Sequence, residues 1–556
     1  MSDDEKKMPL PIGIDDFKKL RDGGYYYVDK TELIRDLCVP CVGATMVLMP
    51  ERFGKSLNLS MIDAFLNIKY KGNHWFDGLK INEYPEMEKE RNTHPVIYLN
   101  MKGLTKDTEE DFIEAMKNKM SSVYKEFAYL KDSEKVHEIY HKWYLQVEAG
   151  EPDYVTLENS LYDLSAMLHK HHGIEPVILI DDWEQPLNES CHKDSYKDIK
   201  DFLHLFYSQA LKSNKHCSCC IVTGVMAIVL DMMTSGLNHF WVYDPSYYRN
   251  RGRYGFTGSE VRNLCTYYGH PEKFEEAEEW YGGYHCSDIL ASNPYSVIHY
   301  IDQGFVPGQY CIGKEWTGMI DAYLRDTNRY AWDYLYRLGN GDREYESLSH
   351  AVERNDFYTK RGHTISILLS MGLFTAFRPA DDDMGYDDIL IPNCELYSFF
   401  YDRVKDILFR DKKDVYAEFF DALERDDIDN IGKTLCTLFS KKYSFPTHYW
   451  DKNYRKNIAL ISLGRKGRYH FDLDSDSRKR VIDVVMKSRC ARYPNIVIEI
   501  KRSRAQKEST AESQAANALE QIGQKKCCEG LKGKTVLYGI CYYAQKAVIH
   551  SEMKIL

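Results

Sequence analysis

The 556-residue sequence contains no apolar run near the roughly 18 residues that a membrane-spanning helix needs. Its first ten residues, MSDDEKKMPL, are charged and lack the apolar core of a secretory signal. Internal repeats and low-complexity tracts are also missing. The sequence therefore predicts neither a membrane protein nor a secreted one. Its 44% hydrophobic content with 13% aromatic residues is typical of a globular protein, and its length predicts about three domains.

A complete cysteine framework for zinc is absent as well. The 15 cysteines are scattered, and those close together in sequence are Cys38 with Cys41, then Cys217, Cys219 and Cys220, and finally Cys527 with Cys528. A structural zinc site needs four well-spaced ligands, and the second CxxC that would complete one is missing. We therefore expect reduced thiols in a cytoplasmic or nuclear protein.

Excess positive charge is confined to one segment. The net charge of −11 argues against a nucleic-acid platform over the whole surface. Residues 451–510, however, hold 16 Lys/Arg against 7 Asp/Glu, a local balance of +9. Such a segment is a candidate phosphate-contacting face, although a solvated charged surface is the common alternative. We predict nucleic acid, DNA or RNA, as the partner of this segment, and leave open a protein partner or a homo-oligomer.

The order of expected elements predicts an α/β protein in three parts. Short apolar runs at 45–49, 95–100, 176–181 and 219–224 alternate with helical patterns at 56–68, 109–128 and 157–171, which is typical of a largely parallel sheet. Residues 256–440 look mostly helical. The tail adds a helix near 449–463, strands at 481–486, 495–500 and 535–543, and a helix at 509–528. The expected domains are 1–255, 256–440 and 441–556.

A phosphate-binding loop is expected after the first strand. The sequence PERFGKSLNLSMIDAFL places Gly54, Lys55 and Ser56 between a strand and a helix. Backbone N–H groups at such a helix start hold phosphates, the lysine reaches the terminal ones, and the serine ligates Mg²⁺. The standard first glycine is replaced by Met49, so a chance GKS at a helix start remains an alternative.

The third strand, PVILIDD, ends in two carboxylates. Asp181 stands at the strand tip, where it could hold the magnesium through water. In Walker-type hydrolases, a glutamate that polarises water usually follows that aspartate. Here the next residue is Asp182, which is one methylene shorter.

These segments together resemble a known family. The stretches LPIGIDDFKKLRDGGYYYVDKTELI, RFGKSLNLSM, HPVIYLNMKG, PVILIDDWEQPLN, TGVMAIVLDMMTSGLNHF, YGFTGSEV and NPYSVIHYI look like those of AAA-ATPase-like proteins that carry a C-terminal PD-(D/E)XK nuclease-like domain. The resemblance runs in order through nearly the whole chain. It implies a P-loop domain that binds ATP and Mg²⁺, in which Arg52 belongs to the nucleotide site. Tyr27, Asp29 and Lys30 match a signature near the nucleotide, with a helix cap and aromatic packing as the alternative, and Tyr281 and Tyr284 match a turn.

Three departures from the family pattern fall at positions that are expected to balance the negative charge of the phosphates. Glu51 replaces the first of two arginines before FGKS, and DDWEQPLN replaces DEYDTPLN, which removes the glutamate. Ala227 stands where the family usually places an arginine. We therefore expect nucleotide binding together with weak or absent hydrolysis.

The strand YPNIVIEIKRSRA carries a second constellation. Glu499 and Lys501 are two residues apart in an apolar strand, so both side chains should project from the same face. Asp483 lies 16 residues upstream in another apolar run, and two antiparallel strands would bring it beside them. The resemblance makes this the Asp…Glu-x-Lys set of a nuclease, in which Asp483 and Glu499 hold Mg²⁺ or Mn²⁺ and Lys501 acts on water and on phosphate charge.

Two further residues belong to this expectation. Gln521 in AANALEQIGQKKCC matches the family's helix glutamine, which can position the metal-bound water or the substrate phosphate. Asp451 or a neighbour would fill an acidic position on the preceding helix. The sequence thus predicts an ATP-binding protein with a metal-dependent nuclease domain. The alternatives are a nucleotide-dependent regulatory protein with an inactive nuclease fold, and a structural partner-binding protein.

Overall fold

The computed structural model forms two compact units, residues 1–311 with 345–388, and residues 312–344 with 389–556. The structure describes residues 7–38, 43–104, 106–190, 193–225, 240–245, 252–313, 344–346, 368–377, 387–400, 413–438, 469–471, 484–490, 492–503, 507–524, 531–543 and 546–556.

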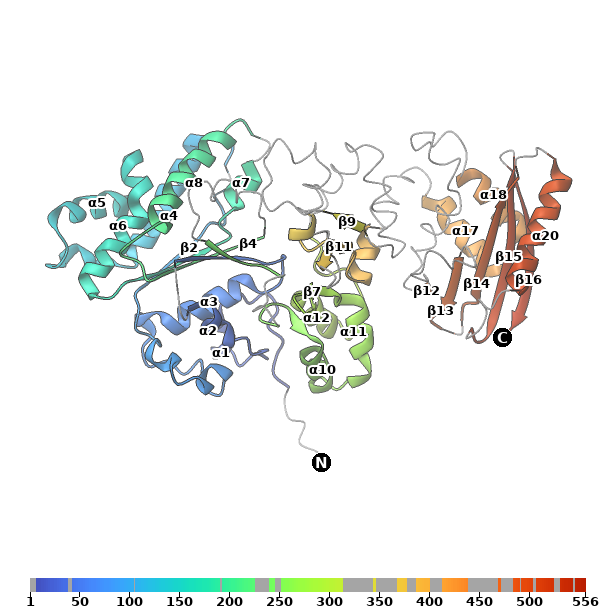
Figure 1. The fold of residues 1–556 in the computed structure, drawn as a ribbon, viewed down its shortest axis with the longest axis horizontal. Coiled ribbons are helices and arrows are strands. Elements are labelled where there is room, and N and C mark those ends of the chain that lie inside the picture. The colour runs from blue at the N-terminus through green and yellow to red at the C-terminus, as the bar shows by residue number, and fades with distance from the viewer. Residues whose placement is uncertain are drawn as a thin grey trace, which may run out of the picture. The chain divides into compact units, whose positions relative to one another are not determined.

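The first unit is built on a five-stranded parallel sheet (Figure 1). Its strands are β1 (Ala44–Leu48), β2 (Val96–Asn100), β3 (Val177–Asp181), β4 (Cys219–Gly224) and β5 (Phe240–Tyr243). They lie in the order β2-β3-β4-β1-β5, and every neighbouring pair is parallel. The four expected strands and the parallel α/β architecture of this part are confirmed; β5 was not expected.

Helices cover both faces of this sheet (Figure 1). On one face α4 (Glu109–Lys125), α5 (Glu138–Ala149), α6 (Tyr154–His172), α7 (Gln185–Ser190) and α8 (Tyr196–Leu211) share one apolar core with the strands. On the other face lie α1 (Phe17–Asp22), α2 (Glu32–Cys38) and α3 (Lys55–Leu66). Short 3-10 helices occur at Ile68–Tyr70, Lys80–Glu83, Met87–Lys89 and Ala128–Asp132.

Local capping explains where the long helices begin and end. The Thr108 side chain accepts the N–H of Asp111 at the start of α4, and the Asp153 side chain accepts the N–H of Thr156 at the start of α6. Gly173, with φ 70°, ends α6 in the left-handed conformation that a glycine adopts without strain.

The described parts of residues 256–440 contain helices, as expected, together with short strands that the sequence did not predict. The helices are α10 (Gly258–Tyr267), α11 (Phe274–Tyr281), α12 (Pro294–Asp302), α17 (Lys413–Arg425) and α18 (Ile428–Leu438), with a 3-10 turn at Pro271–Lys273. One small sheet, in the order β6-β8-β7, contains β6 (Phe256–Thr257), β7 (Tyr284–Cys286) and β8 (Ile289–Ser292). Another contains β9 (Glu344–Glu346), β10 (Thr375–Phe377) and β11 (Asp387–Leu390) in the order β10-β11-β9. Strands of two to four residues are too short to show an alternating pattern. The three expected domain boundaries stay predictions.

The second unit contains a mixed five-stranded sheet. Its strands, in spatial order, are β12 (Tyr469–Phe471), β13 (Val484–Ser488), β14 (Asn495–Arg502), β15 (Lys534–Tyr543) and β16 (Lys546–Ile555). Strands β12 to β14 are antiparallel, β14 and β15 are parallel, and β15 and β16 are antiparallel. Helix α20 (Glu508–Gln524) lies in the chain between the two parallel strands.

Alternating side chains of β14 divide the core of this unit in two. Ile496, Ile498 and Ile500 pack with buried residues of α17 and α18. Val497, on the opposite face, packs with Ile522 of α20. The expected strands at 495–500 and 535–543 and the helix near 509–528 are present. The expected helix at 449–463 lies outside the described residues.

Candidate functional site

The loop between β1 and α3 has two residues in the left-handed backbone conformation close to the start of α3. Gly54, the N-cap of α3, has φ 84°, and Arg52 has φ 65°. A side chain at position 54 would meet almost nothing, so the left-handed backbone rather than crowding is what favours glycine there. The Arg52 guanidinium lies over the Tyr295 ring of α12, 4.5 Å from its centroid. The contact with Tyr295 therefore links the loop to α12.

Lys55 is folded back onto this loop. Its ammonium donates to the backbone carbonyls of Met49 at 3.0 Å and Pro50 at 2.8 Å, and the residue is 7% exposed. Burial lowers the pKa of Lys55 below its usual value. Four carboxylates act in the opposite direction, those of Asp182, Glu51, Glu184 and Asp181. The lysine thus lies in a strongly acidic environment.

Ser56 and Asp181, predicted as magnesium ligands, are brought together. Asp181 is fully buried at the end of β3, where Thr223 donates to it at 2.6 Å and Asn100 at 3.2 Å. Burial raises the pKa of Asp181, as does Asp182, while its hydrogen bonds to Thr223 and Ser56 lower it. Two adjacent oxygen donors, one of them a buried carboxylate beside a second acid, fit a small divalent cation.

Asp182 points to a different partner. Its backbone has φ 52°, and its carboxylate forms an ion pair with Lys102 at 2.9 Å. The position expected to carry the water-polarising group is thus occupied by a short side chain paired to a lysine.

Glu184 was missed by the sequence reasoning. It is 3% exposed, one carboxylate oxygen accepts the N–H of Val225 at 2.7 Å, and the other has no hydrogen-bond partner. Burial raises its pKa to about 7. Gly224 makes room for it, because a Cβ at 224 would lie 2.2 Å from the free oxygen. In the sequence, Glu184 could have been identified as the acid three residues after Asp181 in DDWE. It was overlooked because the family pattern places its glutamate at position 182, where this chain has an aspartate.

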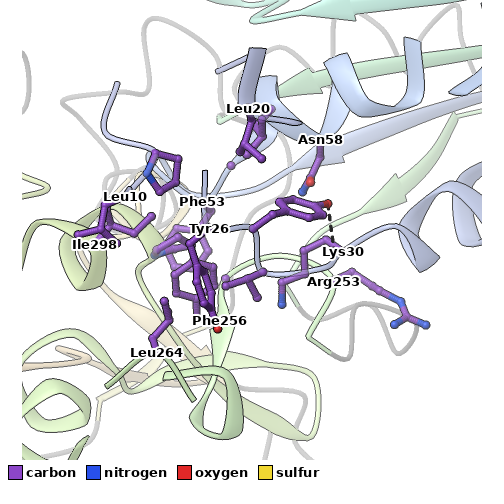
Figure 2. A pocket seen from close by; sticks show the side chains of 17 residues that line it. Leu10, Leu20, Tyr26, Lys30, Phe53, Asn58, Arg253, Phe256, Leu264 and Ile298 are labelled. Carbon is purple, nitrogen blue, oxygen red and sulfur yellow. Dashed lines mark hydrogen bonds between the residues drawn. The ribbon is translucent and has the colours of Figure 1, made fainter. Parts of the chain in front are cut away.

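An apolar cavity of about 80 Å³ adjoins the phosphate loop (Figure 2). Its walls come from the N-terminal segment, the phosphate loop with the first turn of α3, and residues between 253 and 298. They include Leu10, Pro11, Leu20, Tyr26, Tyr27, Val28, Lys30, Phe53, Gly54, Leu57, Asn58, Arg253, Gly255, Phe256, Leu264, Pro294 and Ile298. Gly54 belongs both to the loop and to the cavity wall.

The two cationic side chains of this wall are paired with protein groups. The Lys30 ammonium donates to the Gly252 carbonyl at 2.6 Å and to both carboxylate oxygens of Glu260, at 2.8 and 2.7 Å. Arg253 donates to Asp36 at 2.6 Å and to Glu32 at 2.7 Å. The cavity therefore offers a largely apolar surface.

The residues of the expected YYYVDK signature separate into two roles. Tyr27 and Lys30 line the cavity, whereas Asp29 accepts the N–H and hydroxyl of Thr31, the residue before α2. Of the two residues in the expected turn, Tyr284 lies edge-on to Phe53 of the loop, with ring centroids 4.9 Å apart. Ala227 lies outside the described residues.

The second unit brings Glu499 and Lys501 into contact. The Lys501 ammonium lies 2.9 Å from one carboxylate oxygen of Glu499, which is 4% exposed. The other oxygen of Glu499 is buried without a hydrogen-bond partner. Asp483 and Asp451 lie outside the described residues. The ladder between β13 and β14 has Val484 opposite Ile498 as its last described pair, one residue short of Asp483 on one strand and of Glu499 on the other.

Gln521 lies on α20, and its role beside this ion pair stays a prediction. The next residue, Ile522, packs against Val497, two residues before Glu499. Within the described ranges no hydrogen bond joins Gln521 to Glu499 or Lys501. Gln514, on the same helix, accepts from the thiol of Cys541 at 3.4 Å, and Cys541 is the ladder partner of Lys501. The described residues contain no group of three His, Cys, Asp or Glu side chains placed to hold a metal ion.

Comparison with known proteins bears on the first of these sites. Residues 11–234 match the family described as predicted AAA-ATPase, AAA-ATPase-like. These residues form an AAA-ATPase-like domain. The match contains the phosphate loop, β3 and β4, but ends before the second unit, so the AAA-ATPase-like part of the expectation is confirmed and the nuclease part stays a prediction.

Two individual proteins add little beyond this domain. The chain is 25% identical over 298 residues to an uncharacterized protein in the vnfD 5′ region of Azotobacter chroococcum mcd 1. That match covers 52% of this chain and 51% of the relative, so the chain spans about half of the relative's length. Among solved structures, the ORC2 protein of Aeropyrum pernix, in ADPNP–ADP complexes, is similar with 12% identity, over 73% of this chain and 96% of that one. Its TM-score of 0.26 is too low to support a shared arrangement of elements.

No helix in the described ranges is long and apolar enough to cross a membrane.

Proposed function

We propose that the AAA-ATPase-like domain binds ATP with Mg²⁺ across the phosphate loop and the adjoining cavity. The observation that carries this proposal is the position of Gly54, which belongs to both. A nucleotide with its phosphates on the N–H groups of the loop would have its base and sugar directed to the apolar wall beside it. Lys55 would then exchange the carbonyls of Met49 and Pro50 for phosphate oxygens.

The acidic surroundings of Lys55 explain why a cation should accompany the nucleotide. Asp181 and Asp182 would repel a bare triphosphate, and one lysine cannot neutralise both the phosphates and the carboxylates. Ser56 and Asp181 are the residues that would hold Mg²⁺, which supplies positive charge to the phosphates.

Calorimetry with the full chain tests this proposal. ATP with Mg²⁺ should bind, Lys55→Ala should weaken binding at least tenfold, and the exposed control Lys71→Ala should not. Inorganic tripolyphosphate should bind more weakly than ATP, because it leaves the cavity unfilled. Absence of ATP binding to the unaltered chain would refute the proposal.

A second candidate function rests on Glu499. We infer that the second unit cleaves nucleic-acid phosphodiesters with Mg²⁺ or Mn²⁺, held by Glu499 and Asp483. What supports this is a buried carboxylate with one oxygen on Lys501 and the other without a partner, since burial of an anion is costly unless a cation or proton compensates it. The metal would supply activated water and charge neutralisation at the phosphate.

The basic segment, residues 451–510, would contribute phosphate contacts that position the substrate. Nuclease assays on single- and double-stranded DNA and RNA, with Mg²⁺, Mn²⁺ or chelator, test this inference. Cleavage should require the ion and be lost in Glu499→Gln, while Glu508→Gln, an exposed glutamate of α20, should be active. If no substrate is cleaved with either ion, a partner-binding or regulatory role for this unit is favoured.

A further inference from the structure

Strand β16 is an edge strand with an exposed second half. It pairs with β15 along its whole length and, within the described residues, has no strand on its other side. Helices cover its first half, where Ala547 and Ile549 join the apolar core and Val548 packs beside α20. Beyond Ser551 this cover ends, and Met553 and Ile555 are 49% and 89% exposed.

The backbone groups on the free edge can be assigned from the ladder with β15. Leu556 and Gly533 exchange both backbone hydrogen bonds. In an antiparallel pair such residues alternate with residues whose N–H and C=O point to the other side. The groups of Ile555, Met553 and Ser551 are therefore directed away from β15, toward the free edge.

In the second half of β16, uncharged and charged side chains lie on opposite faces of the strand. Ser551, Met553 and Ile555 lie on one face, and Glu552 and Lys554 lie on the other. The last two form an ion pair at 3.0 Å, with 50% and 37% of their side chains exposed. Long edge strands are commonly protected by lysines, but here the charge of Lys554 is balanced by that of Glu552.

We propose that β16 pairs with β16 of a second copy of this chain, antiparallel, about a twofold axis at Met553. In this arrangement Met553 faces its own copy and Ser551 faces Ile555 of the second copy. All of these residues direct their backbone groups to the free edge, so each pair can exchange two hydrogen bonds. Glu552 then faces Lys554 of the second copy on the opposite face, where opposite charges stabilise a cross-strand pair.

Neighbouring registers are unfavourable, some because of charge and others because of backbone hydrogen bonding. A shift of the axis by one residue places either Glu552 opposite Glu552 or Lys554 opposite Lys554, and like charges directly opposite each other are destabilising. A shift by half a residue pairs outward-directed backbone groups with inward-directed ones, which removes the hydrogen bonds. The register centred on Met553 satisfies both conditions, and the symmetry makes the interface closed, as in most homodimers.

Sedimentation velocity of the full chain over a concentration series tests the proposal. The unaltered protein should show a monomer–dimer equilibrium. Glu552→Lys turns two attractive pairs per dimer into two repulsive ones, so its dissociation constant should rise roughly tenfold or more. The double exchange E552K/K554E reverses every pair without removing any, so it should return the dissociation constant close to the original value.

Two further variants separate this edge from general effects of charge and folding. Lys546→Glu changes a charge on the same strand seven residues from the axis and should leave the equilibrium unchanged. Met553→Pro removes an outward-directed N–H without removing a bond to β15, so it should give a monomer with an unchanged melting temperature. A protein that is monomeric at every concentration, or a dimer that none of the β16 variants weakens, would overturn the proposal.

Discussion

The carboxylate of Glu184 accepts the backbone N–H of Val225 at 2.7 Å, which links the segment after β3 to the residue that follows β4. Its second oxygen is buried without a partner, in space that Gly224 leaves open. A carboxylate in this position is costly to ionise, and it lies in the same acidic environment as Lys55.

The raised pKa of Glu184 predicts a stability that falls as the pH rises. Burial moves this pKa from 4.5 to about 7, so the folded state binds more protons than the unfolded state between these values. The penalty is absent below the unfolded pKa and is complete above the folded one, where it amounts to about 3 kcal/mol. Glu184→Gln should therefore melt higher than the unaltered protein at pH 8 and at nearly the same temperature at pH 5.

Thermal melts at the two pH values check this prediction. Glu83→Gln, at an exposed glutamate of the same unit, is the control and should shift the melting temperature equally little at both. If Glu184→Gln melts lower than the unaltered protein at pH 8, the ionised carboxylate is stabilised by a partner and the prediction is wrong.

Binding of a nucleotide at Lys55 should stabilise the folded protein. A ligand that binds only the folded state adds about 2.7 kcal/mol at one hundred times its dissociation constant. ATP with Mg²⁺ should therefore raise the melting temperature of the unaltered protein. Lys55→Met should abolish this rise while leaving the melting temperature without nucleotide unchanged or higher, because the buried ammonium no longer has to be desolvated. An equal rise in both proteins would place the nucleotide away from Lys55.

The periodic elements were predictable from sequence because their signals are local. Strands β1 to β4 are apolar runs of five or six residues between helical patterns, and these indicate a parallel sheet directly. Residues that depend on long-range packing were not predictable. Glu184 is identified by the space above Gly224, 40 residues away in sequence. Lys30 was expected near the nucleotide from the family resemblance, but its ion pair with Glu260, 230 residues away, was not.

Strand β16 shows the same limit in the second unit. Its sequence, KAVIHSEMKI, mixes apolar and charged residues without a strict alternation, because its faces are covered over only half its length. The geometry of Glu499 and Lys501, by contrast, followed from their spacing of two in a strand. The spacing of Gln521 gave no comparable information, because the level at which a helix residue meets the sheet depends on how α20 packs.

The ion pair between Asp182 and Lys102 predicts slow turnover of ATP. A carboxylate held by a lysine is a poor group for polarising water, so the rate should fall below the 1 s⁻¹ at the lower end of common enzyme rates, about 1–10³ s⁻¹. Asp182→Glu extends the carboxylate by one methylene and should raise the rate, while Asp182→Asn should lower it. Release of phosphate under single-turnover conditions measures this. Brisk hydrolysis by the unaltered protein would contradict the prediction.

Glu499 should show opposite effects on stability and on cleavage. Its unpartnered oxygen is buried, so replacement by the neutral glutamine in Glu499→Gln should preserve or raise the melting temperature of the second unit in the presence of chelator. The same change should abolish metal-dependent cleavage. Lys501→Met should reduce cleavage about 10²-fold or more while largely retaining metal binding. If Glu499→Gln is destabilised, and the unaltered protein neither binds metal nor cleaves nucleic acid, then Glu499 and Lys501 have a structural role only.

Gly539 and Gly523 provide a matched test of how α20 packs on β15. A Cβ at Gly539, the ladder partner of Glu499, would lie 2.3 Å from the carbonyl oxygen of Ala515 and 2.5 Å from the backbone nitrogen of Leu519. Because both are backbone atoms, Gly539→Ala must displace the helix, and we expect a loss of roughly 1–3 kcal/mol in the free energy of unfolding. Gly523 lies exposed in α20, and a Cβ there would meet nothing within 4 Å. Gly523→Ala should therefore stabilise the protein by about 0.5–1 kcal/mol, since alanine favours the helix. Denaturant unfolding of both variants measures the difference, and equal effects would show that α20 does not lie against the backbone of β15 at this point.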